Sequence, residues 1–452
     1  MILLRATLLA QLALASASSS TAAEPLPSRS PTSTPTPSIR ELSLDDALRE
    51  LDRQSLTLAQ ARARTQEAAG MARQALSAAL PTLTASGAYT RNSDQARAPI
   101  GQLLAVVNPG APPVSDLVIQ PLEVFSATGV LRVPLVAASA WAEIAAARSS
   151  ERAAGASAQA VRLQVRSALV QAAWSAAAGE ETVAATERAV ESAEEQVRLA
   201  DRALSAGTGV PLSVLQARTE AVKRRSDLAR AAADLGRARL AVGVLLGRAE
   251  PVRIALPPAQ ALGALDAQAL AREALERRPE VLATSAQLES AERQLTSARL
   301  RLVPQLSASA SAFAQDSPLP TGRNDGWRLT LDLAWPLYDG GFRYGRARQA
   351  EGAISGTRAA AEAQRVEIVQ QVEDAARDVG VAGERLGLAE DQVKLAAEAA
   401  ATARRGFAAG ISSSLDVLDA NDRLYQSEVG LAEARARLGI ALATLDRAAG
   451  RS

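Results

Sequence analysis

The two halves of this chain carry the same features in the same order, and this repetition constrains the fold more than any other property. Residues 207–217 correspond to residues 410–420 at a shift of 203, and Leu80-Pro81 corresponds to Val303-Pro304 at a shift of 223. The shifts differ because the segment between the two predicted strands is longer in the first half. Such a repeat indicates a duplicated unit. We place a first repeat at residues 42–250, a linker at 251–265 and a second repeat at 266–452.

Composition excludes several classes of function. The 452 residues include no Cys and no His, which argues against zinc sites of the usual kind, thiol nucleophiles and acid–base catalysis by His. Because the net charge is only +1, there is no electrostatic reason to expect a nucleic-acid partner. We therefore expect no enzymatic activity, no catalytic residue, no metal ligand and no cofactor.

The N-terminus has the pattern of a secretory signal. Arg5 supplies the positive charge, an apolar run follows, and small residues offer cleavage after Ala17 or Ala23. We expect the signal peptide at residues 1–23 and an extended Pro/Ser/Thr-rich linker at 24–41. No later stretch of about 18 apolar residues predicts a transmembrane helix.

Each half contains a long helix that must have a partner along its length. From Ala142 to about Ala206 there is no Pro, and a helix of that length would span roughly 95 Å. A heptad seam with small residues at alternate positions follows both long helices. Its larger members are Leu169, Val183, Val190, Val197 and Leu204 in the first half and Val372, Val379, Leu386, Val393 and Phe407 in the second. A short Gly-containing turn then folds a second helix back, so each half is predicted to form a helical hairpin.

Four segments of about ten residues alternate between apolar and polar side chains. In the last of them, predicted to run from residue 326 to residue 337, Leu329, Leu331 and Leu333 share one face of a strand. Arg328 and Thr330 share the other face. A half-buried soluble sheet and a tilted membrane strand give the same alternation. Because the chain carries an export signal, we favour membrane strands over a soluble sheet. Open sheet edges are not tolerated in lipid, and a sheet of only four strands has two of them. Several chains would then have to contribute four strands each.

The order of elements, residues 335–341 (WPLYDGG) and residues 416–420 (DVLDA) resemble TolC-like outer-membrane efflux proteins. The resemblance implies a mainly α fold with a small β part and a homotrimer. Three chains would build a twelve-stranded barrel in outer-membrane lipid and a helical tunnel through the periplasm. It also implies a periplasmic adaptor protein and an inner-membrane transporter of the RND, ABC or MFS type as partners. The first half departs from the family pattern, because its strand exit lacks the Asp-Gly-Gly run.

The resemblance also assigns roles to individual residues. Asp416 and Asp419 match the acidic residues that ring the periplasmic entrance, although a carboxylate at Asp416 also suits the first turn of a helix. Arg404 and Arg405 precede this tip and are candidates for pairing with carboxylates on other helices. The predicted adaptor contacts are the two tips, which are Gly207, Thr208, Gly209, Gly410, Ile411 and Ser412. The strand-to-helix turn is marked by Trp335, Pro336, Gly340 and Gly341.

Residues 93–121 are expected to form an extracellular loop, because they are rich in Pro and account for the extra length of the first half. The competing hypothesis is a secreted structural coiled coil or adhesin without a pore. It predicts a water-soluble rod that needs no detergent.

Overall fold

The computed structural model describes residues 40–110, 112, 117–258, 265–317 and 322–451. The expected signal peptide and residues 24–39 of the expected linker lie outside the described residues, as do residues 259–264 of the linker between the repeats. Within the described part of the chain, no helix carries a run long and apolar enough to cross a membrane.

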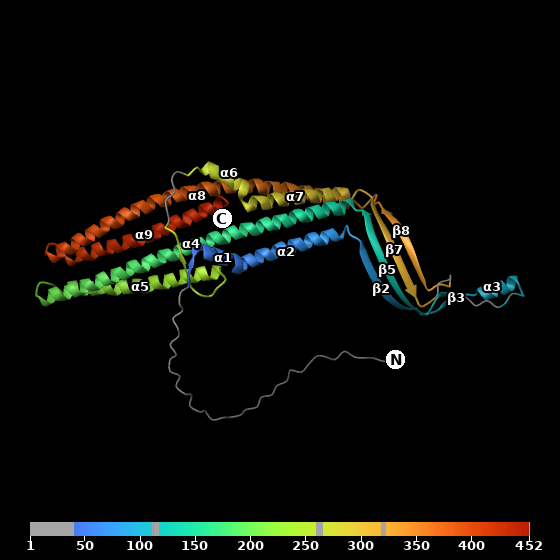
Figure 1. The fold of residues 1–452 in the computed structure, drawn as a ribbon, viewed down its shortest axis with the longest axis horizontal. Coiled ribbons are helices and arrows are strands. Elements are labelled where there is room, and N and C mark those ends of the chain that lie inside the picture. The colour runs from blue at the N-terminus through green and yellow to red at the C-terminus, as the bar shows by residue number, and fades with distance from the viewer. Residues whose placement is uncertain (1–39, 111, 113–116, 259–264, 318–321, 452) are drawn as a thin grey trace, which may run out of the picture. The chain divides into compact units, whose positions relative to one another are not determined.

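The first half begins with a short strand, two helices and a long strand, and it ends with a helical hairpin (Figure 1). Its elements are β1 (Arg40–Ser43), α1 (Leu44–Gln54), α2 (Leu56–Ser77), β2 (Thr82–Arg91), β3 (Ala96–Ala98), α3 (Ile100–Val107), β4 (Leu117–Gln120), β5 (Glu123–Val136), α4 (Ala138–Ser205), α5 (Pro211–Leu245) and β6 (Val252–Ala255).

The second half repeats this order, and the repeat holds to the residue for most helix ends. Its elements are α6 (Ala267–Arg277), α7 (Pro279–Leu300), β7 (Gln305–Gln315), β8 (Asp325–Ala334), α8 (Phe342–Ala408) and α9 (Ser414–Ala448). Both ends of α9 lie 203 residues after those of α5, and both ends of α7 lie 223 residues after those of α2. The predicted hairpins and the internal duplication are therefore confirmed.

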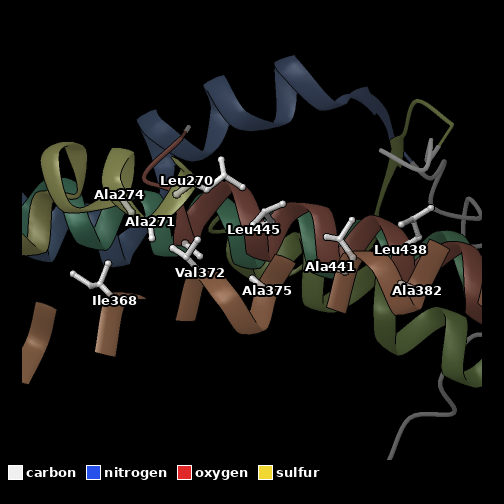
Figure 2. Close-up of a cluster of buried hydrophobic side chains, with 13 residues drawn as sticks. Leu270, Ala271, Ala274, Ile368, Val372, Ala375, Ala382, Leu438, Ala441 and Leu445 are labelled. Atoms are coloured by element: carbon white, nitrogen blue, oxygen red, sulfur yellow. The ribbon is translucent and has the colours of Figure 1, made fainter. Parts of the chain in front are cut away.

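Each half has its own apolar core where its first helix meets its hairpin. In the second half, α6, α8 and α9 bury Ala274, Val372 and Leu445 among others (Figure 2). The first half buries Leu51 of α1, Leu169 of α4 and Val242 of α5 in the same way. These three residues are the repeat equivalents of the three named above. Both cores contain many Ala residues, which let the helix backbones approach closely, as the heptad seam predicts.

The long helix of the first half joins the two halves. The 68 residues of α4 span about 100 Å at 1.5 Å per residue, and α4 packs against α5 and α2 of its own half and against α7 and α9 of the other. Both hairpins lie side by side in Figure 1.

The four long strands form one antiparallel sheet in the order β2-β5-β7-β8. One face carries large apolar side chains that are mostly exposed, and the other is mainly polar. The exposed apolar residues include Leu83, Tyr89, Phe125, Leu131, Trp327, Leu329, Leu331 and Leu333. Strand β8 ends at Ala334, earlier than the alternation to Leu337 predicts. In the described part of the chain, β2 and β8 each leave one edge without a partner strand.

Three segments expected to be linkers or a loop contain strand residues. Strand β1, at the end of the expected N-terminal linker, pairs in parallel with β6, in the expected linker between the repeats. Val252 and Ile254 are buried in the first core, so part of this linker belongs to the first repeat. The expected loop at 93–121 contains α3 and the paired strands β3 and β4, while its residues 111 and 113–116 lie outside the described residues.

Candidate functional site at the hairpin tips

The two hairpin tips share one backbone geometry. Gly207 and Gly410 both have left-handed backbone angles, with φ of 77° and 73°, which favour glycine at the end of a helix. In the second tip, the amide of Ile411 donates to the carbonyl of Gly406 at 2.8 Å. The Ile411 side chain is 85% exposed. Each tip is thus a hydrogen-bonded, glycine-dependent turn that presents exposed side chains.

Close approach of the backbone fixes a second glycine in each tip. A Cβ at Gly209 would lie 2.8 Å from the amide nitrogen of Leu204, and a Cβ at Gly406 would collide with the Ser412 hydroxyl. Gly209 is the repeat equivalent of Ser412, and Ala203 that of Gly406. The same two positions are therefore in close contact in both tips. The glycine occupies the later position in the first tip and the earlier position in the second.

Asp416 caps the helix that starts at the second tip. Its side chain accepts a hydrogen bond from the Ser413 amide at 2.7 Å, and the Ser413 hydroxyl accepts one from the Asp416 amide at 3.2 Å. This is a reciprocal capping box. The hydrogen bonds from the side chain and then the backbone of Ser413 lower the pKa of Asp416 below its usual value. The first-turn role of Asp416 is thus confirmed, and its role at an entrance stays a prediction.

Asp419 follows the capping box by about one turn of α9 and takes no part in it. It pairs with Arg423 one turn later at 2.9 Å and is 58% exposed. Together with Asp422 it lines a groove of about 490 Å³ between the first turns of α5 and α9, and Lys223 lies on the opposite wall. Arg404 and Arg405 donate to Ala400 and Thr402 of their own helix, so in the described residues neither makes the predicted contact with a carboxylate.

A buried arginine joins the two hairpins a few turns from the tips. The Arg224 side chain on α5 is 5% exposed and contacts Asp422 on α9, Glu220 at 2.7 Å and Asp227 at 3.5 Å. Its guanidinium also lies over the Tyr425 ring, 4.5 Å from the centroid.

Burial lowers the pKa of Arg224, but these carboxylates more than reverse that effect, so the pKa is raised and the charge is retained. Sequence reasoning missed this cluster. Its one local signal is the spacing of Glu220, Arg224 and Asp227 on one helical face.

The strand-to-helix turn of the second half is held by its own side chains. Asp339 accepts from the amides of Gly341 and Arg343, both at 3.2 Å, and from the Arg343 guanidinium at 2.7 Å. Gly340 and Gly341 have φ of 66° and 87°. The Trp335 indole donates to the Leu302 carbonyl at 3.2 Å. In the first half, the single residue Ala137 separates β5 from α4, which removes the need for such a turn.

Comparison with known proteins identifies the family. A family model described as "Outer membrane efflux protein" matches residues 47–248 and 270–451, which is most of the chain and one segment in each half. The chain belongs to the outer membrane efflux protein family. As a member of this family it is a protein of the outer membrane, and the mainly α fold expected from the TolC-like resemblance is confirmed.

Two curated relatives of this outer membrane efflux protein have informative names. The cobalt-zinc-cadmium resistance protein CzcC of Cupriavidus metallidurans is 27% identical over 336 residues, which cover 72% of this chain and 77% of the relative. The outer membrane protein OprJ of Pseudomonas aeruginosa is 28% identical over 185 residues, covering 39% of this chain and 38% of OprJ.

Solved structures share the whole fold at lower identity. The outer membrane protein VceC of Vibrio cholerae superposes with a TM-score of 0.74 at 21% identity, covering 90% of this chain and 96% of VceC. The open state of the Neisseria gonorrhoeae MtrE outer membrane channel gives 0.74 at 18% identity, covering 90% and 89%. At these identities the likeness supports the fold.

Proposed function

We propose that this outer membrane efflux protein is the exit duct of a tripartite pump. Three copies would close their sheets into a twelve-stranded barrel, and their helices would continue it as a periplasmic tunnel. The duct conducts cargo passively and catalyses no reaction. The observation that carries the proposal is the four-stranded sheet, because its apolar face is exposed and, among the described residues, neither of its edges has a partner strand. Lipid would cover that face, and strand pairing between copies would satisfy the edges.

The test is reconstitution of the mature protein. We expect a trimer in detergent by light scattering and discrete conductance steps in planar lipid bilayers. A monomer that stays soluble in plain buffer and produces no conductance would instead support the secreted coiled-coil hypothesis. The exposed apolar face makes that outcome unfavourable, since a soluble rod would leave it in contact with water.

The adaptor contact is proposed to be the tips, at residues 207–209 and 410–412. Their support is the exposed, glycine-dependent turn of each hairpin. Gly410 has a left-handed backbone that strains any residue with a side chain, and Trp at this position also adds bulk. We expect Gly410→Trp to reduce export while the trimer and membrane insertion are retained. Gly387→Trp is the matched control, because Gly387 is an exposed glycine in the middle of α8. Equal export by both variants would argue against tip docking.

Asp416 and Asp419 are proposed to contribute an acidic ring at the periplasmic entrance. Both are exposed, and three copies of each would place six carboxylates about one axis. The variant Asp416→Gln with Asp419→Asn removes these charges while Gln retains the capping box. We expect weaker cation selectivity and weaker block by multivalent cations. Ser413→Ala disrupts the cap and leaves the carboxylates, so it should affect local stability and not selectivity. An unchanged reversal potential in the first variant would contradict the acidic ring.

The cargo proposed for a first test is a divalent metal cation. CzcC, the curated relative with the longer match, is named for cobalt, zinc and cadmium resistance. Deletion of the gene should lower the tolerated concentration of these metals, and the intact gene should restore it. The transporter partner, of the RND, ABC or MFS type, would be identified by co-purification after cross-linking.

A further inference from the structure

The polar face of the four-stranded sheet carries three charged side chains, and two of them are arginines. Arg132 lies on β5, and Arg328 and Asp332 lie on β8. All three are exposed in the single chain. The other residues that these four strands contribute to the polar face are uncharged. The face therefore has an excess of one positive charge per chain.

The strand register brings these charges to one part of the sheet. Arg132 lies opposite Ser309 of β7, and Ser309 lies opposite Thr330 of β8. Arg328 and Asp332 are two residues to either side of Thr330, so about 12 Å of sheet separates the backbone of each from that of Arg132. The Ser309 hydroxyl donates to the Asp332 carboxylate at 3.4 Å. The three charged groups thus share one surface and lie on both sides of β7.

The charges on the apolar face are arranged differently, because they lie at the strand ends and are paired. Arg91 pairs with Glu123 at 3.0 Å, and Asp325 pairs with its neighbour Arg323 at 3.5 Å. Within the described part of the chain, neither arginine of the polar face makes an ion pair. Their positive charge is therefore available to a solute beside the sheet.

We propose that the barrel part of the duct is an anion-attracting section formed by Arg132 and Arg328 of every copy. The inference rests on the proposed duct and adds a charge selectivity to it. When lipid covers the apolar face of the sheet, the polar face lines the lumen. Three copies then supply six arginines against three Asp332 carboxylates. Rings of arginine or lysine are the device by which pores favour anions.

The arginines lie close enough to the barrel axis to act on a passing ion. Twelve strands that are about 4.8 Å apart and tilted by about 40° enclose a lumen whose backbone wall is roughly 12 Å from the axis. The side chains project inward from that wall, so their charges come within about one Debye length of the axis, which is ~10 Å in 0.1 M salt. In 1 M salt the Debye length is about 3 Å. The selectivity must therefore weaken as the salt concentration rises.

This section has the opposite charge to the proposed acidic ring at the periplasmic entrance. The 67 residues of α8 span about 100 Å between the sheet and the tip, which is many Debye lengths, so the two sections act independently on an ion. A cation that a pump delivers would be attracted at the entrance and repelled in the barrel. The positive section would thus lower the passive leak of external cations back through the duct.

Recordings in planar lipid bilayers test the inference. Arg132→Gln combined with Arg328→Gln keeps polar side chains on the wall and removes two positive charges per copy. From the reversal potential in a gradient of KCl around 0.1 M, we expect the ratio of K⁺ to Cl⁻ permeability to rise roughly three- to tenfold. Block of the current by tripolyphosphate, a multivalent anion, should weaken in the same variant. Both effects should be largely lost in 1 M KCl.

Two matched variants define the sign and the place of the effect. Asp332→Asn removes a negative charge from the same face, so it should lower the ratio of K⁺ to Cl⁻ permeability. Arg91→Gln removes an arginine that is paired on the apolar face, so it should leave the ratio nearly unchanged. If the double variant forms no channels, each single variant, Arg132→Gln or Arg328→Gln, should produce part of the shift.

The outcomes separate this inference from the proposed function. Channels of normal conductance with an unchanged permeability ratio, in the double variant or in both single variants, would overturn the anion-attracting section and leave the duct intact. A shift of equal size in 0.1 M and 1 M KCl would also overturn it, because wall charges must be screened. Failure of the natural protein to produce conductance steps would overturn both the section and the duct.

Discussion

Arg224 is expected to hold the two hairpins together near their tips. Its side chain is 5% exposed and faces three carboxylates that are only 23–30% exposed. Among the described residues, the change Arg224→Ala would leave Glu220 and Asp422 with one cation, the exposed Lys223. Loss of one partner from a fully buried ion pair costs about 3–5 kcal/mol. Because the carboxylates here retain some contact with water, we expect roughly 2–3 kcal/mol.

Hydrogen exchange measures this loss directly, since it reports local opening in the assembled protein. At about 1.4 kcal/mol per factor of ten, amides of α5 and α9 around the cluster should exchange roughly 30- to 150-fold faster. The matched control is Lys223→Ala. Lys223 is 55% exposed and lies 3.8 Å from Glu220 and 3.9 Å from Asp422, so it approaches two of the same carboxylates. Its loss should cost less than about 1 kcal/mol.

A second variant separates charge from packing. Arg224→Gln combined with Asp422→Asn leaves a neutral hydrogen-bonding pair between α5 and α9, and we expect much slower exchange than in Arg224→Ala. The reasoning is refuted if Arg224→Ala accelerates exchange no more than Lys223→Ala does.

Three further outcomes follow from local geometry. Gly439→Ala would drive a Cβ into the Trp174 ring, so it should cost about 1–3 kcal/mol and alter tryptophan fluorescence; an unchanged spectrum would contradict this packing. Gly341→Ala should destabilise the start of α8 by about 1 kcal/mol, seen as faster hydrogen exchange there, because φ is 87°. Hydrogen bonds from Arg162 lower the pKa of Asp52, so Asp52→Asn should reduce thermal stability at neutral pH. The loss of thermal stability relative to the natural protein should shrink as pH falls below 3.8 and through the lowered pKa of Asp52. A loss that stays the same at all pH values would contradict this reasoning.

Local patterns predicted the elements because each depends on nearby residues. The heptad seam and the Gly-containing turns gave both hairpins, and the alternation gave the apolar face of the sheet. The prediction for β8 failed at its end. Pro336 has no amide hydrogen for a ladder, and Trp335 would lie opposite Pro304, which has none either, so pairing stops at Ala334. Alternation of side chains carries no information about either effect.

Contacts between distant segments were beyond the sequence patterns. The expected linkers include the start of β1 and all of β6, which become strands because they pair with each other across about 210 residues. Arg224 and Asp422 are 198 residues apart, and each alone has the appearance of a solvated helical charge. For Asp416, the sequence offered both a cap and an entrance role, and the capping box confirms the first.

The sequence by itself determined the duplication, the helical hairpins, the strands with one apolar and one polar face, and the family. Each of these appears in the sequence as a periodic or local pattern. Only the tertiary structure decided which faces of the two repeats are used within one chain. The repeats have nearly the same local pattern, yet Ser167 of α4 and Ala443 of α9 are buried against each other, while their equivalents Gln370 on α8 and Leu240 on α5 are exposed. That difference arises because one chain packs α4 along α9, whereas α5 meets α9 mainly around the Arg224 cluster. A periodic sequence specifies a face, and the connectivity of the chain specifies which partner covers it.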